Sequence, residues 1–317
     1  MAKEKTSTQL RKLIASGETF VKPGSYDCLS AMVLERAGFK AIGTSGYAIS
    51  TSLLGKPDLG FFSLNDAVDV CHRITNAISV PLIADADTGY GNAINAMRTV
   101  QEFIEAGAAG IHIEDQQFPK RCGHIGGKTV ISKEEMCGKI RACCRVRDEM
   151  DKDFVLIVRC DVRGTSDGSL EKLIDRCNAY VDAGADVIFP EAIPSEEELV
   201  EVARKVRAPL HYNRSGFGIS PIIPLKRLQE IGNIAMTSDP TGIMRAALEG
   251  MSIHAEQFMA DDADYLNRFK ARIGKKYGSL HRFTNLPYYL ELEKEFLPAE
   301  DLKRYEGSLG WGASVEI

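Results

Sequence analysis

The chain of 317 residues lacks an excess of positive charge: 39 lysines and arginines stand against 44 aspartates and glutamates, for a formal net charge of -5. Without a basic excess, neither nucleic acid nor an anionic membrane is expected as a partner. No apolar run approaches the length of a membrane span, and the charged amino-terminal stretch has no apolar core of the kind found in signal peptides. We therefore expect a soluble, cytoplasmic protein.

The sequence also lacks a Cys-x-x-Cys motif, although it contains eight cysteines. Most of them lie within apolar helical or strand patterns, where free cysteine behaves as a small buried hydrophobe. A disulfide framework is not expected in a chain of this length without a secretion signal. We predict structural thiols, with Cys122 as the exception.

Neither a G-x-G-x-x-G nor a Walker phosphate loop is present, but a unit of amphipathic helix, Ala-Gly turn and short apolar strand recurs. Glycine just past a helix end takes the left-handed conformation, and a continuous apolar run is typical of a strand buried on both faces. Strands are predicted at 20–23, 40–45, 80–85, 109–114, 154–161, 186–190, 209–213 and 234–238. Helices are predicted at 27–37, 64–78, 93–107, 133–149, 169–183, 195–206, 224–231 and 241–250.

Eight strands that alternate with eight helices predict an α/β fold, the (β/α)8 TIM barrel. An open doubly wound sheet is the competitor, but it usually has fewer strands and a glycine-rich loop after the first. We expect residues 1–250 to form the barrel catalytic domain and residues 251–317 to form a C-terminal helical extension. A closed barrel has little need of this extension, which we expect to pack on a neighbouring subunit; the alternative is an appendage on its own barrel.

Polar side chains follow nearly every predicted strand, and barrel enzymes carry their chemistry at these carboxyl ends. Asp85 and Asp87, with Glu114 from the next strand, have no lysine or arginine close by in sequence. They would repel one another unless a cation or protons intervened, and hard oxygen ligands favour Mg²⁺. Helix-capping aspartates around a glycine turn are the alternative. His112 is predicted to be a buried core histidine.

A long loop follows the Glu114 strand, and its Pro119 and three glycines predict a mobile lid over residues 116–127. Cys122 stands between Arg121 and His124 in this loop. An electropositive neighbourhood would lower the thiol pKa and raise its reactivity. We expect Cys122 to act as a nucleophile or as a proton donor.

At these stretches the chain resembles the isocitrate lyase / phosphoenolpyruvate mutase superfamily. Its lyases carry a (K/R)-(K/R)-C-G-H loop similar to Lys120-Arg121-Cys122-Gly123-His124. The resemblance runs from Pro23 to about Gly250 and includes the segments Ser45-Gly46-Tyr47, Lys56-Pro57-Asp58, Ala84 to Gly91, Arg159-x-Asp161 and Asn213. It implies a barrel whose eighth helix is exchanged between paired subunits, usually in a homotetramer.

The resemblance also implies roles for individual residues. Cys122 would be the general acid, and Arg159 would stabilise the negative charge that develops in the reaction. The ion would be Mg²⁺, with Mn²⁺ as the alternative, held by Asp85, Asp87, Glu114 and Asp58. A di- or tricarboxylate substrate would be bound by Ser45, Gly46, Tyr47, Gly123, His124, Arg159, Glu191, Asn213, Pro240, Arg245 and Arg282.

The chain departs from the family pattern where many of its lyases carry a tyrosine, a candidate base for the substrate hydroxyl, two residues before the loop serine. Gly43 stands there. The family's Arg-Thr-Asp-Ala reads Arg-Cys-Asp-Val at 159–162, and its Asn-Met-Thr-Glu-Phe-Gly reads Asn-Arg-Ser-Gly-Phe-Gly at 213–218, without the glutamate.

Residues 45–58 most resemble the 2,3-dimethylmalate lyase, petal death protein and oxaloacetate hydrolase branch. Tyr47 fills space and favours a short substrate, and Pro240 stands where the hydrolases tend to have serine. We therefore predict Mg²⁺-dependent cleavage of the C2–C3 bond of 2,3-dimethylmalate or a related alkylmalate. A 2-oxo acid such as pyruvate and a short carboxylic acid would be released.

Other functions are weighed against this prediction. Methylisocitrate lyase activity is the second hypothesis, left open by Arg282 and the tyrosines that follow it, and hydrolysis of oxaloacetate to oxalate and acetate is the third. Phosphonate mutases and hydrolases rank low because they normally lack the loop cysteine. A barrel that binds without turnover is the non-enzyme alternative, and Gly43 is the feature in its favour.

Overall fold

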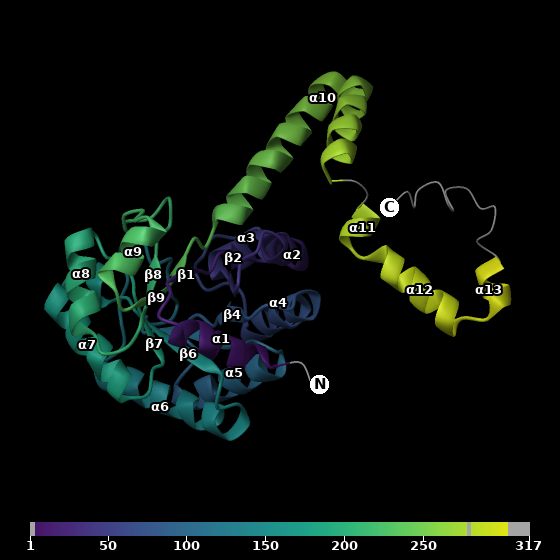
Figure 1. Ribbon diagram of the computed structural model, residues 1–317. Coiled ribbons are helices and arrows are strands. Elements are labelled where there is room, and N and C mark those ends of the chain that lie inside the picture. The colour runs from purple at the N-terminus through teal and green to yellow at the C-terminus, as the bar shows by residue number, and fades with distance from the viewer. Residues whose placement is uncertain (1–3, 278–279, 304–317) are drawn as a thin grey trace. The chain divides into compact units, whose positions relative to one another are not determined.

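The computed structural model describes residues 4–277 and 280–303, and within them nine parallel strands form one sheet in the order β1-β9-β8-β7-β6-β5-β4-β3-β2. β1 (Phe20–Val21) lies within the first predicted strand, 20–23, and β2 (Gly24–Ser25) begins just after it; they pair with β9 and β3, the strands at the two ends of the series. Pro23, which has no N–H, lies between β1 and β2. The sheet therefore closes through residues 20–25, and the predicted (β/α)8 barrel is confirmed (Figure 1).

The predicted strands and helices correspond closely to the observed ones. The remaining strands are β3 (Ile42–Thr44), β4 (Leu82–Asp85), β5 (Gly110–Glu114), β6 (Val155–Cys160), β7 (Val187–Pro190), β8 (Leu210–Asn213) and β9 (Ile234–Ser238). The helices between and after them are α2 (Cys28–Arg36), α4 (Leu64–Ala77), α5 (Ala93–Glu105), α6 (Lys133–Met150), α7 (Leu170–Asp182), α8 (Glu196–Lys205), α9 (Leu225–Ile231) and α10 (Gly242–Tyr277). At the Ala-Gly turns after α2, α5 and α7, the glycines Gly38, Gly107 and Gly184 have positive φ angles, as expected.

Three short elements and the length of one helix differ from the prediction. α1 (Thr6–Ala15), α3 (Gly46–Leu54) and the 3₁₀ turn η1 (Val162–Gly164) were not predicted. The helix predicted at 241–250 was too short, because α10 continues to Tyr277 with non-helical backbone angles at Asp262. The eight cysteines are all free thiols.

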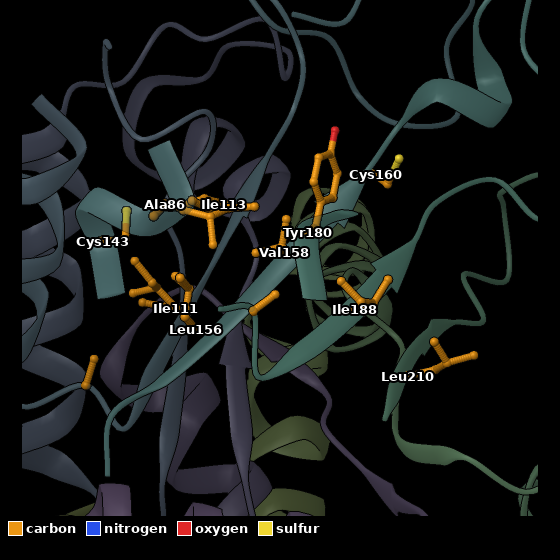
Figure 2. Packing of buried hydrophobic residues seen from close by; sticks show 14 of the residues in the cluster. Ala86, Ile111, Ile113, Cys143, Leu156, Val158, Cys160, Tyr180, Ile188 and Leu210 are labelled. Carbon is orange, nitrogen blue, oxygen red and sulfur yellow. The ribbon is translucent and has the colours of Figure 1, made fainter. Parts of the chain in front are cut away.

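Strand alternation divides the core into two layers. In β6, Val155 and Ile157 belong to a cluster inside the barrel, whereas Leu156 and Val158 belong to the layer between strands and helices. Figure 2 shows residues of this outer layer, among them Leu156 and Val158 of β6 and Tyr180 of α7. Leu10 of α1 is fully buried in the inner cluster, so α1 seals the barrel. The two layers hold the strands in a fixed register, and the carboxyl ends of the strands lie at the end of the barrel away from α1.

The chain divides into two compact units, Met1–Ala247 and Leu248–Ile317. The second unit contains most of α10 and the helices α11 (Leu280–Phe283), α12 (Leu286–Phe296) and α13 (Ala299–Lys303). Among the described residues, no helix combines the length and apolarity that a membrane crossing requires. Helix exchange and a homotetramer stay predictions, supported by apolar side chains that this unit exposes, such as Met259, Leu280 and Phe296.

Candidate active site

The alternation that fills the barrel interior continues to the carboxyl ends of the strands, where the inward positions become polar. Ile83 of β4 is followed two residues later by Asp85, and Ile157 of β6 by Arg159. The register pairs Asp85 with His112 of β5 and aligns Glu114 with Arg159. Apolar and ionisable groups therefore share one face of each strand, and the ionisable groups meet at one end of the barrel.

A cavity of about 270 Å³ opens at this end. Its walls include the predicted residues Ser45, Tyr47, Asp58, Asp85, Cys122, Gly123, His124, Arg159, Glu191, Asn213, Pro240 and Arg245. Three others lie directly against that wall: Gly46 and Asp87 donate N–H groups to Asp85, and Glu114 is 3.1 Å from Arg159. Arg282 lies exposed on α11 in the second unit, so its role as a substrate ligand stays a prediction.

The carboxylates of the site are accompanied by a lysine that is not close to them in sequence. Lys120 Nζ lies 2.6 Å from Asp58 Oδ1 and 2.9 Å from Asp87 Oδ1, and all three side chains are buried. The carboxylates, which have no lysine or arginine close by in sequence, therefore have a lysine close by in space. Lys120 belongs to the lid, and chain folding brings it to carboxylates that are distant in sequence.

Gly46 holds Asp85 in place at the start of α3. Its N–H donates to Asp85 Oδ2 at 2.8 Å, and a Cβ at this position would lie 2.8 Å from the same oxygen. In this arrangement the N–H of Gly46, a residue that the resemblance implies in substrate binding, is already used by Asp85. Ser45 caps the same helix, because its hydroxyl accepts from the Ala48 N–H at 3.4 Å.

Burial and mutual repulsion separate the pKa values of the clustered carboxyls. Burial, with the charges of Asp85 and Asp58, raises the pKa of Asp87 to about 7 although Lys120 opposes the shift. Burial also acts on Asp85, but the His112 ring, Lys120 and two backbone N–H groups outweigh it and hold its pKa below the usual range. Asp85 is therefore the group in this cluster that stays ionised most readily.

The donor set of the cluster fits Mg²⁺. Glu114 Oε1 is buried and has no hydrogen-bond partner among the described residues. Mg²⁺ prefers such carboxylate oxygens, and it usually keeps several waters and binds one or two protein carboxylates. No three His, Cys, Asp or Glu side chains in the described part of the chain surround a common ion position. Protein carboxylates together with water would therefore form the shell.

The lid over residues 116–127 lies closed on the cavity. The Gln116 side chain holds it at the base, with 2.9 Å hydrogen bonds to the backbone N–H and C=O of Arg121. At its centre, His124 Nε2 lies 3.1 Å from Glu191 Oε1 and 3.3 Å from the Asn213 amide nitrogen. Lys128 donates to the Gly123 carbonyl. Lid closure therefore places His124 against residues at the ends of β7 and β8, and Cys122 on the wall of the cavity.

Closure changes the expected chemistry of Cys122. The thiol is mostly buried, and this burial raises its pKa, although the His124 N–H and the Arg159 charge act in the opposite direction. The predicted lowering of the pKa was wrong, because the closed lid removes the sulfur from water and desolvation penalises the thiolate. A protonated thiol is the form that a general acid requires.

Arg159 is fixed by a carboxylate on each side. Its Nη1 lies 3.1 Å from Glu114 Oε2, and its Nε lies 2.8 Å from Asp161 Oδ2 and 3.7 Å from Glu191 Oε2. Although burial opposes the charged form, these carboxylates hold the pKa of Arg159 well above its usual range. The guanidinium is thus a permanent, preorganised positive charge on the cavity wall.

Some of the wall was not predicted as site residues. His112 is buried as expected, and burial lowers its pKa to about 3, so its ring is neutral. With Phe189 and His211 it forms an aromatic floor, with ring centroids 5.9 Å apart for His112–Phe189 and 4.2 Å apart for Phe189–His211. Lys22 also lines the cavity, and its one sequence signal is a charged residue within the apolar strand 20–23.

Comparison with a protein-family model identifies similarity over residues 10–259 to the family described as phosphoenolpyruvate phosphomutase. A 2-methylisocitrate lyase of Aeropyrum pernix is 43% identical over 256 residues, covering 81% of this chain and 80% of the relative. A 2,3-dimethylmalate lyase of Eubacterium barkeri is 39% identical over 246 residues, covering 78% of this chain and 83% of that protein.

Solved structures give the same grouping. A 2,3-dimethylmalate lyase superposes with a TM-score of 0.85 at 31% identity, covering 97% of this chain and 99% of the other. Oxaloacetate acetylhydrolase in complex with 3,3-difluorooxalacetate has a TM-score of 0.83 at 32% identity, with coverage of 92% and 98%. Phosphonopyruvate hydrolase in complex with oxalate and Mg²⁺ has a TM-score of 0.82 at 25% identity, with coverage of 93% and 100%.

Proposed function

The chain belongs to the phosphoenolpyruvate mutase / isocitrate lyase superfamily, a group of carbon–carbon lyases and mutases, and from this premise we propose that it is a Mg²⁺-dependent lyase of 2,3-dimethylmalate or a related alkylmalate. The products would be pyruvate or another 2-oxo acid and a short carboxylic acid. The observation that carries the proposal is the closed lid, which brings Cys122 to the same cavity as Arg159 and buries its thiol, so that its pKa is raised.

Each half of the proposed reaction has a matching group. Cleavage of the C2–C3 bond leaves the electron pair on C3, as an enediolate of the departing carboxylate. The fixed guanidinium of Arg159 stabilises this charge without reorganisation, and the Cys122 thiol then protonates C3. Mg²⁺ held by Asp85, Asp87 or Glu114 would supply further positive charge for the substrate oxygens.

The small cavity supports a short substrate. Its volume of about 270 Å³ lies at the low end of ligand pockets, and Tyr47 forms part of the wall. Pro240 lines the same cavity and offers no hydroxyl to hold a hydrated carbonyl, which favours cleavage of a hydroxy acid over hydrolysis of oxaloacetate. Methylisocitrate cleavage is the second candidate, because Arg245 lines the cavity and offers a cation for an additional carboxylate.

A product screen tests the proposal. Purified protein with Mg²⁺ is given 2,3-dimethylmalate, 2-methylisocitrate, isocitrate or oxaloacetate, each with an EDTA control, and products are identified by mass spectrometry. We expect pyruvate and propionate from dimethylmalate, abolished by EDTA. Turnover of 2-methylisocitrate alone would replace the proposal with methylisocitrate lyase activity. Oxalate formed from oxaloacetate alone would replace it with oxaloacetate hydrolysis.

The Cys122→Ser variant tests the acid role, and Cys137→Ser is the matched control because that thiol is half-buried on α6, away from the cavity. We expect a loss of about 10² to 10⁴ in kcat for Cys122→Ser, the range for a positioned general acid. Full turnover in Cys122→Ser contradicts the assigned role.

A further inference from the structure

The space beside Gly43 is filled from the neighbouring strand segment. Gly43 lies in β3 and pairs with Gly24 of β2, just beyond Lys22 in the chain. A Cβ built on Gly43 would lie 2.7 Å from Lys22 Nζ and 2.8 Å from Lys22 Cε. The tip of the Lys22 side chain therefore occupies the position where a side chain on residue 43 would begin.

Strand alternation explains why Lys22 reaches this place. Phe20, two residues earlier, belongs to the cluster inside the barrel, so Lys22 also faces the interior. The residue is 3% exposed and lines the cavity together with Asp85 and Ser45. A charged residue in this inward position needs a partner or a function, because burial of an unpaired charge is costly.

Lys22 differs from two other cationic groups of the cavity wall, Lys120 and Arg159. Lys120 is paired with Asp58 and Asp87, and Arg159 with three carboxylates. Among the residues that the structure describes, Lys22 Nζ has no hydrogen-bond acceptor and no carboxylate within 4 Å. Its amine thus points into the cavity with its hydrogen-bonding capacity unused.

From this geometry we propose that Lys22 is the general base of the reaction and that it takes the proton of the substrate's 2-hydroxyl group. The inference rests on the proposed lyase function. It supplies from β1–β2 the proton acceptor that Gly43 cannot provide. Burial lowers the pKa of Lys22 to about 8, which makes the neutral amine accessible near physiological pH, and the Asp85 charge opposes that shift.

The proton and electron changes balance within the cavity. The neutral amine of Lys22 takes the hydroxyl proton, the O–H electron pair forms the C2=O bond, and the C2–C3 pair moves to C3. The Cys122 thiol gives its proton to C3 and becomes a thiolate. After the products leave, the Lys22 ammonium and the Cys122 thiolate exchange a proton through solvent, and the starting state is restored.

Substitutions at Lys22 separate a base from a simple cation. Lys22→Arg keeps a positive charge for binding a carboxylate, but its guanidinium stays protonated and cannot take a proton from the substrate. Lys22→Met has neither the charge nor the base. If Lys22 is the base, both variants lose about 10² to 10⁴ in kcat. Full activity in Lys22→Arg, or a change confined to KM, overturns the proposal and makes Lys22 a binding residue.

The pH profile and amine rescue add readouts that a structural role would not change. The wild-type kcat/KM should rise with pH through a limb near pH 8, which Lys22→Met should lack. Methylamine should restore turnover to Lys22→Ala in proportion to the concentration of free base. An unchanged limb in Lys22→Met, or no rescue in a folded Lys22→Ala protein, counts against the proposal.

Isotope exchange distinguishes Lys22 from Cys122. The short acid carries a proton on the carbon that was C3 of the substrate. In D₂O, with the 2-oxo acid present, exchange of this proton for deuterium requires the Cys122 thiolate but not Lys22. We expect Lys22→Met to retain this exchange while it loses bond cleavage, and Cys122→Ser to lose both. Loss of exchange in Lys22→Met overturns the division of roles.

The wild-type arm keeps the two proposals distinguishable. A wild-type protein that cleaves none of the acids overturns the lyase function, and the base assignment falls with it. An active wild type with a Lys22→Met variant of equal kcat overturns only the base assignment. Lys40→Met is the matched control, because this exposed lysine lies 3.9 Å from Glu18 and outside the cavity.

Discussion

The contact between the lid and the barrel rim at Gly123 leaves no room for a methyl group. A Cβ added there would clash with Arg159 Nη2 and would lie 2.7 Å from Glu191 Cγ. Glu191 is buried, the Arg159 side chain is 11% exposed, and both are held by ion pairs, so neither can retreat easily. Gly123→Ala should therefore disfavour lid closure while it leaves the barrel core unchanged.

The expected magnitude follows from the cost of overpacking. Forcing one methylene into a filled site costs about 1 to 3 kcal/mol. If that cost falls on closure alone, kcat/KM should drop by about 5-fold to 150-fold, at 1.36 kcal/mol for each factor of ten. The melting temperature should stay close to the wild-type value, because the open lid can accommodate the methyl group in solvent.

Gly126→Ala is the matched control on the same lid. A Cβ on Gly126 meets nothing within 4 Å, and no positive φ angle constrains that residue. The assay is 2-oxo acid release from the substrate found in the product screen, with thermal unfolding measured in parallel. Wild-type kcat/KM in Gly123→Ala, or an equal loss in both variants, would refute the closed-lid geometry as the basis of catalysis.

Three further substitutions test the cavity wall and the barrel closure. Pro240→Ser should add oxalate production from oxaloacetate, detected by mass spectrometry, and no oxalate would remove the argument from Pro240. Arg159→Lys should lower kcat by about 10² to 10³, because lysine cannot reproduce the fork that faces three carboxylates, and kcat within a factor of three of wild type contradicts this. Gly24→Ala should lower the free energy of unfolding by about 1 to 3 kcal/mol in urea, because its Cβ would lie 2.8 Å from the Cα of Pro240. Gly138→Ala on α6 is the control: its Cβ would meet nothing within 4 Å, and this variant should not be destabilised.

The barrel was predictable because its strands are buried on both faces. Such strands are continuous apolar runs, as in β5 and β6, and their boundaries lie within one or two residues of the predicted ones. α1 was missed because its charged residues dominate the pattern, while the apolar side chain that it buries fully inside the barrel is Leu10. α3 was missed because it lies in a stretch that was expected to be a loop. Ser45, predicted as a residue of the barrel rim, also caps the start of α3.

The site residues that lie on the strands were predictable from their position in the strand pattern. Asp85 and Arg159 follow apolar strand positions at a spacing of two, so a carboxylate and a guanidinium had to face the same interior. Lys120 and the pKa of Cys122 depend instead on closure of the lid, which brings together segments far apart in the chain. No local pattern contains that information.

Lys22 and Gly43 show how a departure from a family pattern is to be judged. Considered alone, Gly43 removes a candidate base and favours a barrel that only binds. In the folded chain the same glycine makes room for an amine from the adjacent strand segment, 2.7 Å from where its Cβ would be. The two positions therefore form one structural unit, and restoring tyrosine at 43 should help only after Lys22 is removed. Lys22→Met/Gly43→Tyr should be more active than either single variant, and a fully active Gly43→Tyr would contradict this reasoning.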